Sequence, residues 1–407
     1  MNVPFFIARR YFFSTKKKNF INIISILSML VVAVGTAALV IVLSVFNGLE
    51  GLIRTLYTTF DAEIKVATVK GKSFELDSAL FADLQTLNGI EIVTKVLEEN
   101  ALIEHRDDRR VVKIKGVSDN FLDQKRMDSA IVEGEFILRR ENRQYAIIGR
   151  GIQYSLNVGL NNDFYPLKIS FPNNKKILNP TAHDMLVSRF IPVSAVFAIE
   201  KQYDDNYIFT PLEFAESLFN KQGMVSSLEI KTKSGSTISE VKKTLKKRLG
   251  ENFVVQDSDE QHASLLRAIK IEKLFVFIVF TFLLLIASVN IFFSLTMLSI
   301  EKKKDVAILF ALGSSRSSIK KLFLMEGLII AFLGSGLGLL FGFSVCWLQE
   351  QYGLVSMGME TSVVDAYPVQ MKLMDFIYTA LVIILITITV SYRPAWQASR
   401  VNVRENI

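Results

Sequence analysis

Hydrophobic and polar residues are distributed unevenly along the chain, and four long runs contain no charged side chain. These runs span residues 20–46, 274–300, 327–349 and 376–392. An α-helix needs about 20 consecutive apolar residues to cross the hydrocarbon core of a bilayer. The pattern therefore predicts four transmembrane helices.

The region between the first two runs, residues 47–273, has the mixed pattern of a folded domain outside the bilayer. Helical periodicity is found at 77–88 and 237–249. Short alternating runs, which are typical of strands, are found at 61–68, 90–103, 111–117, 145–148, 168–171, 191–199, 227–232 and 253–256. We expect an α-helical membrane protein with a large α+β domain inserted between helices 1 and 2. The two ends of the insertion would form two βαβ-like units, with a β-rich insert between them.

The apolar stripe of the first run continues past residue 46 through Leu49, Leu52, Ile53 and Leu56. A similar stripe precedes the second run. Residues three or four apart lie on one face of a helix, so the pattern predicts that both helices leave the membrane as continuous rods. The alternative is that both end at the membrane surface.

Charge orients the predicted helices across the membrane. The chain has 407 residues, half of them apolar, and a formal net charge of +7. Residues 1–19, 301–326 and 393–407 together hold 14 basic and 4 acidic side chains, whereas 350–375 has one lysine against four acids. Because basic loops stay in the cytoplasm, we expect both termini and the middle loop there, and the large domain outside. The basic excess thus indicates orientation, and it argues against a nucleic-acid partner.

These boundaries divide the chain into nine segments. We expect them to be a cytoplasmic interfacial segment 1–19, helix 1 at 20–46, the outer domain 47–273, helix 2 at 274–300, a cytoplasmic helix and loop 301–326, helix 3 at 327–349, a short outer loop 350–375, helix 4 at 376–392 and a cytoplasmic tail 393–407. For the first segment, a plain charged stop before the span is an equal alternative.

The sequence offers no catalytic constellation and no metal site. Its three histidines, His105, His183 and His262, are far apart and lack neighbours at ligand spacing. The single cysteine, Cys346, excludes a disulfide framework. Gly149 and Gly151 are better explained by a tight turn than by a dinucleotide site. Because a phosphate-binding loop is absent from the sequence, ATP hydrolysis would have to come from another chain.

The connection between helices 2 and 3 has the pattern of a short amphipathic helix. Residues 301–315 read EKKKDVAILFALGSS. Gly313 suits the position after the end of a helix, and Ser314 or Ser315 suits the N-cap of the next. A helix held across the ends of two spans can dock in a groove of a partner protein. An interfacial helix without a partner fits the periodicity equally well.

This connection resembles a motif of the FtsX/MacB-like permeases of type VII ABC transporters. The family pattern is approximately E-K-R-x-(D/E)-I-(A/G)-I-L-(K/R)-A-(L/M)-G-A-S, and here Phe310 replaces a basic residue and Ser314 an alanine. The segments 42–50, 190–197 and 392–400 are similar to the LolC/LolE branch of the family.

The resemblance implies a set of partners. Two such permease chains, alike or different, would assemble with a cytoplasmic LolD-like ATPase that holds ATP and magnesium, whereas this chain binds no cofactor. The assembly would lie in the bacterial inner membrane in contact with its lipid, and it would release lipoproteins from that membrane. A LolA-like periplasmic chaperone would receive them. Residues 47–273 would then be a periplasmic MacB-like core with a β-rich insert.

The resemblance also implies three kinds of site. Side chains that receive the ATPase would be Glu301, Lys302, Lys303, Lys304, Asp305, Val306, Leu309, Phe310, Leu312 and Gly313. Side chains that face the acyl chains of the cargo would be Val42, Val45, Phe46, Leu49, Phe275, Ile278 and Phe282. A loop that holds the carrier would include Pro172, Lys175, Lys176 and Pro180. Lipid-facing helices and a plain hairpin tip would account for the second and third sets equally well.

Two other functional readings remain open. An FtsX/MacB-like permease could use the same mechanics for peptide export or for control of cell-wall hydrolases. The first normally carries a fused ATPase, and the second has a smaller outer domain. A membrane-anchored receptor without an ATPase is a different class, and it would not need the patterned helix at 301–313.

Overall fold

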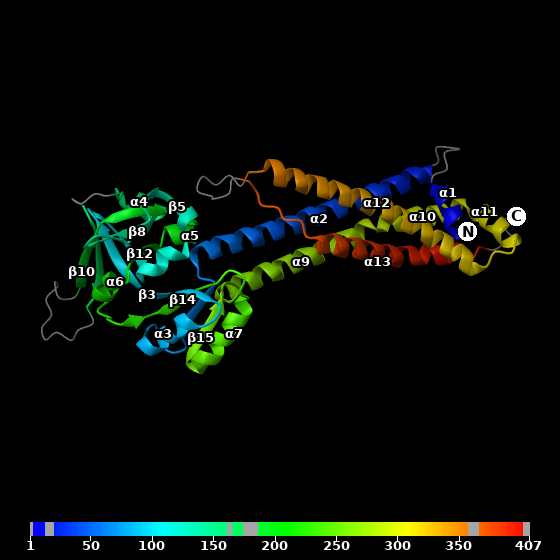
Figure 1. Cartoon of the computed structure of the whole chain (residues 1–407). Helices are drawn as coiled ribbons and strands as arrows, with labels where there is room; N and C mark the ends of the chain where they lie inside the picture. The colour runs from blue at the N-terminus through cyan, green and yellow to red at the C-terminus, as the bar shows by residue number, and fades with distance from the viewer. Residues whose placement is uncertain (1–2, 13–19, 161–164, 174–185, 357–365, 402–407) are drawn as a thin grey trace. The chain divides into compact units, whose positions relative to one another are not determined.

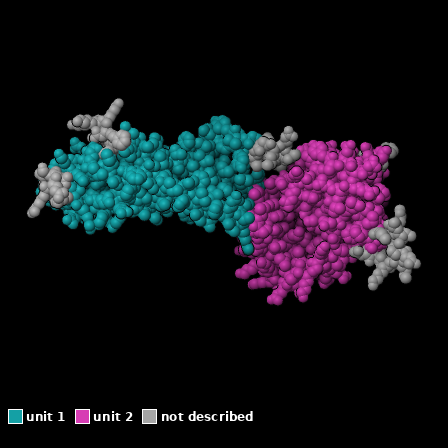
Figure 2. Space-filling model, turned by 180° about the vertical axis from the view of Figure 1, so that it is seen from behind, with its two compact units in different colours: residues 1–52, 267–358, 364–407 teal, residues 53–266, 359–363 magenta. Residues whose placement is uncertain are grey.

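The fold was analysed in a computed structural model, which describes residues 3–12, 20–160, 165–173, 186–356 and 366–401. The chain forms two compact units (Figure 2). One comprises residues 1–52, 267–358 and 364–407, and the other comprises residues 53–266 with 359–363. We call them the helical unit and the sheet unit.

The helical unit is a bundle of long apolar helices (Figure 1). Its helices, two of which extend into the sheet unit, are α1 (Val3–Phe12), α2 (Phe20–Phe60), α9 (Ala263–Ala287), α10 (Val289–Glu301), α11 (Lys303–Ala311), α12 (Arg316–Tyr352) and α13 (Leu373–Ala398). Four stretches are long and apolar enough to cross a membrane: Ile23–Phe60, Ala263–Glu301, Arg316–Tyr352 and Leu373–Ala398. The last three stretches contain the predicted runs 274–300, 327–349 and 376–392, and the first covers the run 20–46 from residue 23 onward.

The first helix is longer than the uncharged run that predicted it. α2 continues for 41 residues without a break, which confirms that the apolar stripe extends the helix past residue 46. The second stretch likewise begins well before residue 274, at Ala263, and a single residue, Ser288, separates α9 from α10. Both helices that flank the inserted domain therefore extend beyond their apolar cores.

The turn between α11 and α12 has the end signals that the sequence predicted. Gly313 has a φ of 92°, a left-handed conformation that favours glycine. The Ser315 side chain accepts a hydrogen bond from the backbone N–H of Ser318, and so caps α12. These two residues fix where one helix ends and the next begins.

Glycines on one face of α12 allow α2 to pack closely against it. A Cβ atom on Gly334 would lie 2.8 Å from the carbonyl oxygen of Met29, and one on Gly338 would lie 2.4 Å from that of Ala33. Gly342 continues the same face toward Ala37. Small residues at this spacing let two helix backbones approach each other in a membrane. In this chain they bring α12 against α2 of the same molecule.

Replacing Gly338 by alanine should destabilise the bundle, because the new Cβ would meet backbone atoms that cannot rotate away. Overpacking of this kind costs about 1–3 kcal/mol. The measurement is thermal unfolding of the detergent-solubilised chain, and the melting temperature should fall by several degrees. Gly336→Ala is the matched control, because a Cβ there has nothing within 4 Å. Equal melting temperatures for the two variants would contradict the close α2–α12 packing.

The sheet unit is built on one large mixed sheet. Its strands follow the order β15-β1-β14-β3-β4-β12-β8-β11-β5, and β9, with β10 at its edge, also pairs with β3. The strands are β1 (Ile64–Thr68), β3 (Ile90–His105), β4 (Asp108–Val117), β5 (Ile131–Gly134), β8 (Ala146–Gly149), β9 (Leu167–Pro172), β10 (Leu186–Ile191), β11 (Val193–Phe197), β12 (Tyr207–Pro211), β14 (Ser227–Thr232) and β15 (Phe253–Asp257). Two short pairs lie outside it: β2 (Phe74–Glu75) with β13 (Met224–Val225), and β6 (Arg139–Arg140) with β7 (Arg143–Gln144).

Helices of the sheet unit connect these strands. The α-helices are α3 (Ser78–Thr86), α4 (Arg150–Leu156), α5 (Lys201–Asp204), α6 (Leu212–Phe219), α7 (Ile238–Leu249) and α8 (Ser258–Gln261), and the 3₁₀ helices are η1 (Asp119–Gln124), η2 (Asp128–Ala130) and η3 (Gly250–Asn252). Asp77 caps α3 by accepting a hydrogen bond from the N–H of Ala79, as expected for an N-terminal aspartate.

The two ends of the inserted domain form the two βαβ units that the sequence predicted, and the structure shows that their strands interlock. β1 and β3 are joined through α3, and β14 and β15 are joined through α7. β14 lies between β1 and β3 and pairs with both of them. β1 in turn lies between β14 and β15 and pairs with both of them. These are two split βαβ units. Leu84 of α3 and Leu245 of α7 are buried in one core with the sheet.

The β-rich insert is not a separate body, because its strands extend the same sheet. β3 is 16 residues long. Its first half pairs with β14, whereas Leu102 to Glu104 pair with β9, and β4 pairs along most of its length. One long strand therefore carries both parts. The sequence predicted the strand but could not show that both parts share it.

Candidate functional site

α11 is a short helix with two different faces. Val306 and Ala307 are buried, and Leu309 and Phe310 are partly buried, against a core that α10, α12 and α13 complete. On the other face Leu312 is 79% exposed and Ile308 is 53% exposed. The family resemblance placed Val306, Leu309, Phe310 and Leu312 in one ATPase-receiving set, whereas the structure divides them into a packing face and an exposed face.

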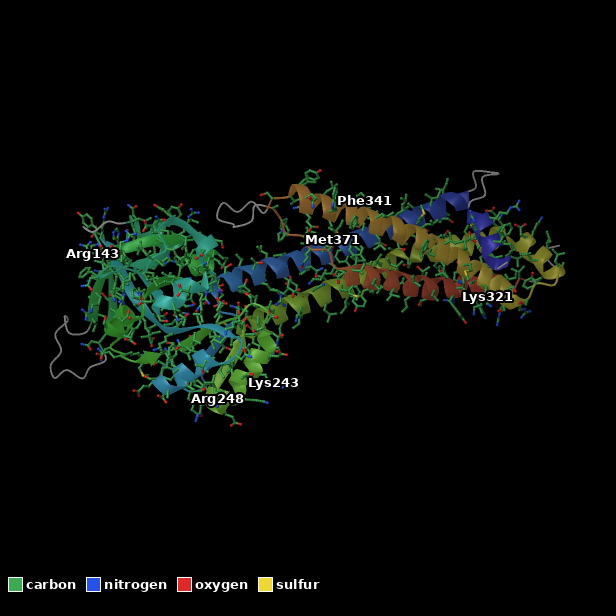
Figure 3. All side chains as sticks on the ribbon, viewed as in Figure 1. Arg143, Lys243, Arg248, Lys321, Phe341 and Met371 are labelled. Atoms are coloured by element: carbon green, nitrogen blue, oxygen red, sulfur yellow. The ribbon has the colours of Figure 1, made fainter. Side chains whose placement is uncertain are left out.

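The exposed face of α11 combines apolar and basic residues. Lys304, Ile308, Ala311 and Leu312 are all exposed, and their spacing places them on one side of the helix. Lys302 lies at the helix start, 3.6 Å from Asp305. Lys321 lies one to two turns into α12, at the same end of the bundle as α11 (Figure 3). An exposed apolar patch rimmed by charge is typical of a protein-binding surface.

The core beneath α11 connects it to three other helices. Its buried members are Leu298 of α10, Val306 of α11, Ile319, Leu322 and Phe323 of α12, and Ala395 and Ala398 of α13. Ile7 of α1 packs against the same cluster. The packing face of α11 is therefore in one close-packed core with parts of α1, α10, α12 and α13.

The far end of α2 is held in the core of the sheet unit. Phe60, the last residue of α2, is 2% exposed. Its ring stacks on Tyr203 with a centroid distance of 4.1 Å, and it lies edge-on to Tyr207 at 4.6 Å. The ammonium group of Lys115 lies 4.7 Å from the centroid of the same ring, within the range of a cation–π interaction.

The start of α9 is attached to the same place. The His262 ring, next to the first residue of α9, stacks on Tyr57 of α2 at 3.6 Å. Its Nε2 atom lies 2.7 Å from Oδ2 of Asp61. The OH group of Tyr203 donates a hydrogen bond to the same carboxylate at 3.3 Å. The ends of α2 and α9 thus meet the sheet unit through one connected set of contacts.

A buried ion network lies beside Phe60. Glu229 is 1% exposed and accepts a hydrogen bond from Nζ of Lys115 at 2.7 Å. Arg126 donates to its other oxygen. Burial by itself would raise the pKa of Glu229, but the charges of Arg126 and Lys115 outweigh it and lower the pKa to about 2. Because that pKa lies below the ordinary value, the network stabilises the fold at neutral pH and loses this contribution only as the pH falls toward 2.

Replacing Glu229 by glutamine should be strongly destabilising, because it removes the buried carboxylate that Arg126 and Lys115 share and leaves Lys115 only its longer pair with Glu98 at 3.7 Å. Breaking a buried pair costs about 3–5 kcal/mol. The measurement is thermal unfolding of the full-length chain, monitored with a spectroscopic probe in the sheet unit. Glu213→Gln is the control, since its pair with Arg139 is exposed and such pairs contribute about 0–1 kcal/mol. A loss no larger than that of the control would show that the network does not support the fold.

The predicted cargo-facing residues do not gather in one described cavity. Phe275, Ile278 and Phe282 are exposed on α9, whereas Val42, Phe46 and Leu49 are half-buried on α2. Val45 lines a cavity of about 270 Å³ with Ile41, Val345, Cys346, Gln349, Val355, Tyr367 and Val369. Gln349 closes one side of it by donating to the carbonyl oxygens of Val355 and Tyr367, at 3.0 and 3.1 Å.

The predicted carrier loop is only partly within the described structure. Pro172 ends β9, which pairs antiparallel with β10. Lys175, Lys176 and Pro180 lie outside the described residues. Among the residues that the structure does describe, no group of three histidine, cysteine, aspartate or glutamate side chains could hold a metal ion.

A polar cluster that was not predicted from the sequence lies at the ends of three apolar runs. Asn47, Lys273 and Asp375 meet in the helical unit. Each is the polar residue that directly borders a predicted span: 20–46, 274–300 or 376–392. In the predicted topology all three borders lie at the same side of the membrane, and that signal could have placed them together.

Comparison with known proteins assigns both parts of the chain to described families. Residues 25–248, more than half of the chain, match the MacB-like periplasmic core domain, and residues 277–403 match the FtsX-like permease C-terminal family. The periplasmic region of MacB from Actinobacillus actinomycetemcomitans covers 51% of this chain and 94% of its own length, at 10% identity and a TM-score of 0.35.

Relatives also align along nearly the whole chain. The lipoprotein-releasing system transmembrane protein LolC of Buchnera aphidicola subsp. Schizaphis graminum is 24% identical, over 97% of this chain and 95% of its own length. The lipoprotein-releasing system transmembrane protein LolE of Haemophilus influenzae is 23% identical, over 98% of each chain. The chain therefore belongs to the family of FtsX-like permeases that carry a MacB-like periplasmic core domain ahead of the permease region.

Proposed function

We propose that this chain is the permease subunit of an ABC transporter that uses ATP hydrolysis on a partner chain to release lipoproteins from the inner membrane to a periplasmic carrier. The observation that carries this proposal is the full-length similarity to proteins named for lipoprotein release, which covers 97–98% of the chain. The similarity includes the sheet unit as well as the helices, so it extends beyond the permease region that related families share.

The exposed face of α11 supports a docked ATPase. In the proposed orientation α11 and both chain termini are cytoplasmic, because the basic side chains gather there. A LolD-like ATPase would bind Leu312 and Ile308 in an apolar groove, with ATP and magnesium held on that chain. The ATPase would be present in two copies. A second permease chain, identical or homologous, would bind the second copy.

Mechanical transmission follows from the helices that leave the bundle. The core beneath α11 includes α10, which continues into α9 after one residue. α9 and α2 both lead to the sheet unit, where Phe60 and His262 are held by stacked rings. Movement of α11 would thus reach the periplasmic domain without a solute-conducting pore, and that domain would pass the lipoprotein to a LolA-like carrier.

Replacing Leu312 by aspartate should prevent ATPase docking while leaving the fold intact, because the side chain is exposed in the isolated chain. Loss of a central interface residue costs about 2 kcal/mol, equivalent to an approximately 30-fold weaker complex. The measurement is co-purification of the ATPase with the tagged permease. Leu354→Asp is the matched control, since Leu354 is 69% exposed but far from α11 in the sequence and fold. Unchanged co-purification with Leu312→Asp would refute the docking surface.

Depletion of the protein in its own host should retain outer-membrane lipoproteins in the inner membrane. The reason is that the proposed transporter supplies the energy that removes them from that bilayer. The measurement is fractionation of the two membranes followed by lipoprotein detection. Wild-type protein should restore sorting, and the Leu312→Asp variant should not. Normal sorting after depletion would instead favour peptide export or cell-wall hydrolase control by the same mechanics.

A further inference from the structure

Three helices of the bundle are joined by one polar cluster, which we call the polar clamp: Asn47 of α2, Lys273 of α9 and Asp375 of α13. Lys273 Nζ donates to Oδ1 of Asn47 at 2.7 Å and lies 3.2 Å from Oδ2 of Asp375. Asn47 Nδ2 donates to the same Asp375 oxygen at 2.6 Å. Each of the three side chains therefore contacts both of the others.

The clamp is buried and its hydrogen bonds are well satisfied. Asn47 is fully buried and Asp375 is 8% exposed. The Asn47 amide donates a further bond to the carbonyl oxygen of Gln370 at 3.2 Å. A charged pair at this depth is costly unless it is matched, and a fully satisfied polar network holds its elements in one arrangement.

The backbone beside the clamp is fitted just as closely. The N–H of Gln370 donates to the carbonyl oxygen of Ser44 at 3.0 Å. A Cβ atom on Gly48 would lie 2.2 Å from the carbonyl oxygen of Pro368. Nζ of Lys372 lies 3.8 Å from Oε2 of Glu50. About two turns of α2 thus contact the segment that leads into α13, the segment in which Met371 is labelled in Figure 3.

The other end of α13 lies in the core beneath α11. Ala395 and Ala398 are fully buried there, together with Val306 of α11. α13 has 26 residues, a length of about 39 Å at 1.5 Å per residue. A single helix therefore joins the core under α11 to the clamp on α2 and α9.

We propose that α13 is a strut and that the polar clamp transmits movement of α11 to the outer ends of α2 and α9. This route is separate from the direct path through α10. The inference rests on the proposed function only for the source of the movement. The competing explanation is that Lys273 and Asp375 merely neutralise each other at the membrane surface.

The test uses the full chain reconstituted with its ATPase and partner permease. Spin labels at Tyr154→Cys and Leu354→Cys, both exposed positions, in a Cys346→Ser background report the distance between the sheet unit and the bundle. In the otherwise wild-type complex this distance should shift on ATP binding. Asp375→Asn and Lys273→Gln should each lose more than half of that shift while ATP hydrolysis stays within about twofold.

A double variant separates transmission from charge balance. Lys273→Met with Asp375→Leu removes both charges, so a purely neutralising pair would regain the full shift. The proposal expects the shift to remain lost. The proposal would be overturned if the double variant regained the ATP-dependent change in distance. It would also be overturned if the single variants showed the same change in distance as the wild type.

A matched glycine pair keeps the test decisive if the charged variants fail to assemble. Gly48→Ala should push the Pro368 segment away and reduce the shift. Gly51→Ala should not, because its Cβ would lie 3.6 Å from Oε1 of Gln370, an ordinary contact. Equal shifts in the two alanine variants would overturn the strut. Absence of lipoprotein release with an intact ATP-dependent shift would instead reject the proposed cargo and leave the strut standing.

Discussion

The unbroken ladder of backbone hydrogen bonds in α2 is the constraint on which the rest of the structure depends. The helix has 41 residues, a length of about 60 Å at 1.5 Å per residue, whereas the hydrocarbon core of a bilayer is about 30 Å thick. α2 must therefore continue outside the bilayer. Glycines of α12 hold it near one end, the polar clamp holds it past the middle, and Phe60 is held in aromatic contacts at the other end.

That arrangement suits mechanical work. The chain offers an exposed helix, α11, whose packing face is shared with α10, α12 and α13. Under the proposed function, an ATPase that moves α11 would move the helices that lead to the periplasmic domain.

Much of this fold could be predicted because its signals are local. Uncharged runs mark the spans, Gly313 and Ser315 mark the turn after α11, and alternation marks the strands of the two split βαβ units. The shared role of β3 could not be predicted, since strand pairing depends on contacts between distant residues. The same holds for α11, where the family resemblance grouped Leu312 with residues that tertiary packing buries.

The polar clamp could have been predicted from the polar residues that border the apolar runs. Asn47, Lys273 and Asp375 border three apolar runs at the same predicted side of the membrane. Polar groups at that depth need partners, so their shared level predicts that they meet. The sequence analysis used these residues only as boundaries, and the contact among them became visible only in the structure.

The central claim is that ATP hydrolysis on a partner chain drives lipoprotein release through this permease. The most direct measurement is a release assay with the purified complex in proteoliposomes that contain a triacylated lipoprotein and a soluble carrier outside. The account predicts that ATP, but not a non-hydrolysable analogue, transfers lipoprotein to the carrier in multiple turnovers. ATP hydrolysis without any transfer would contradict it.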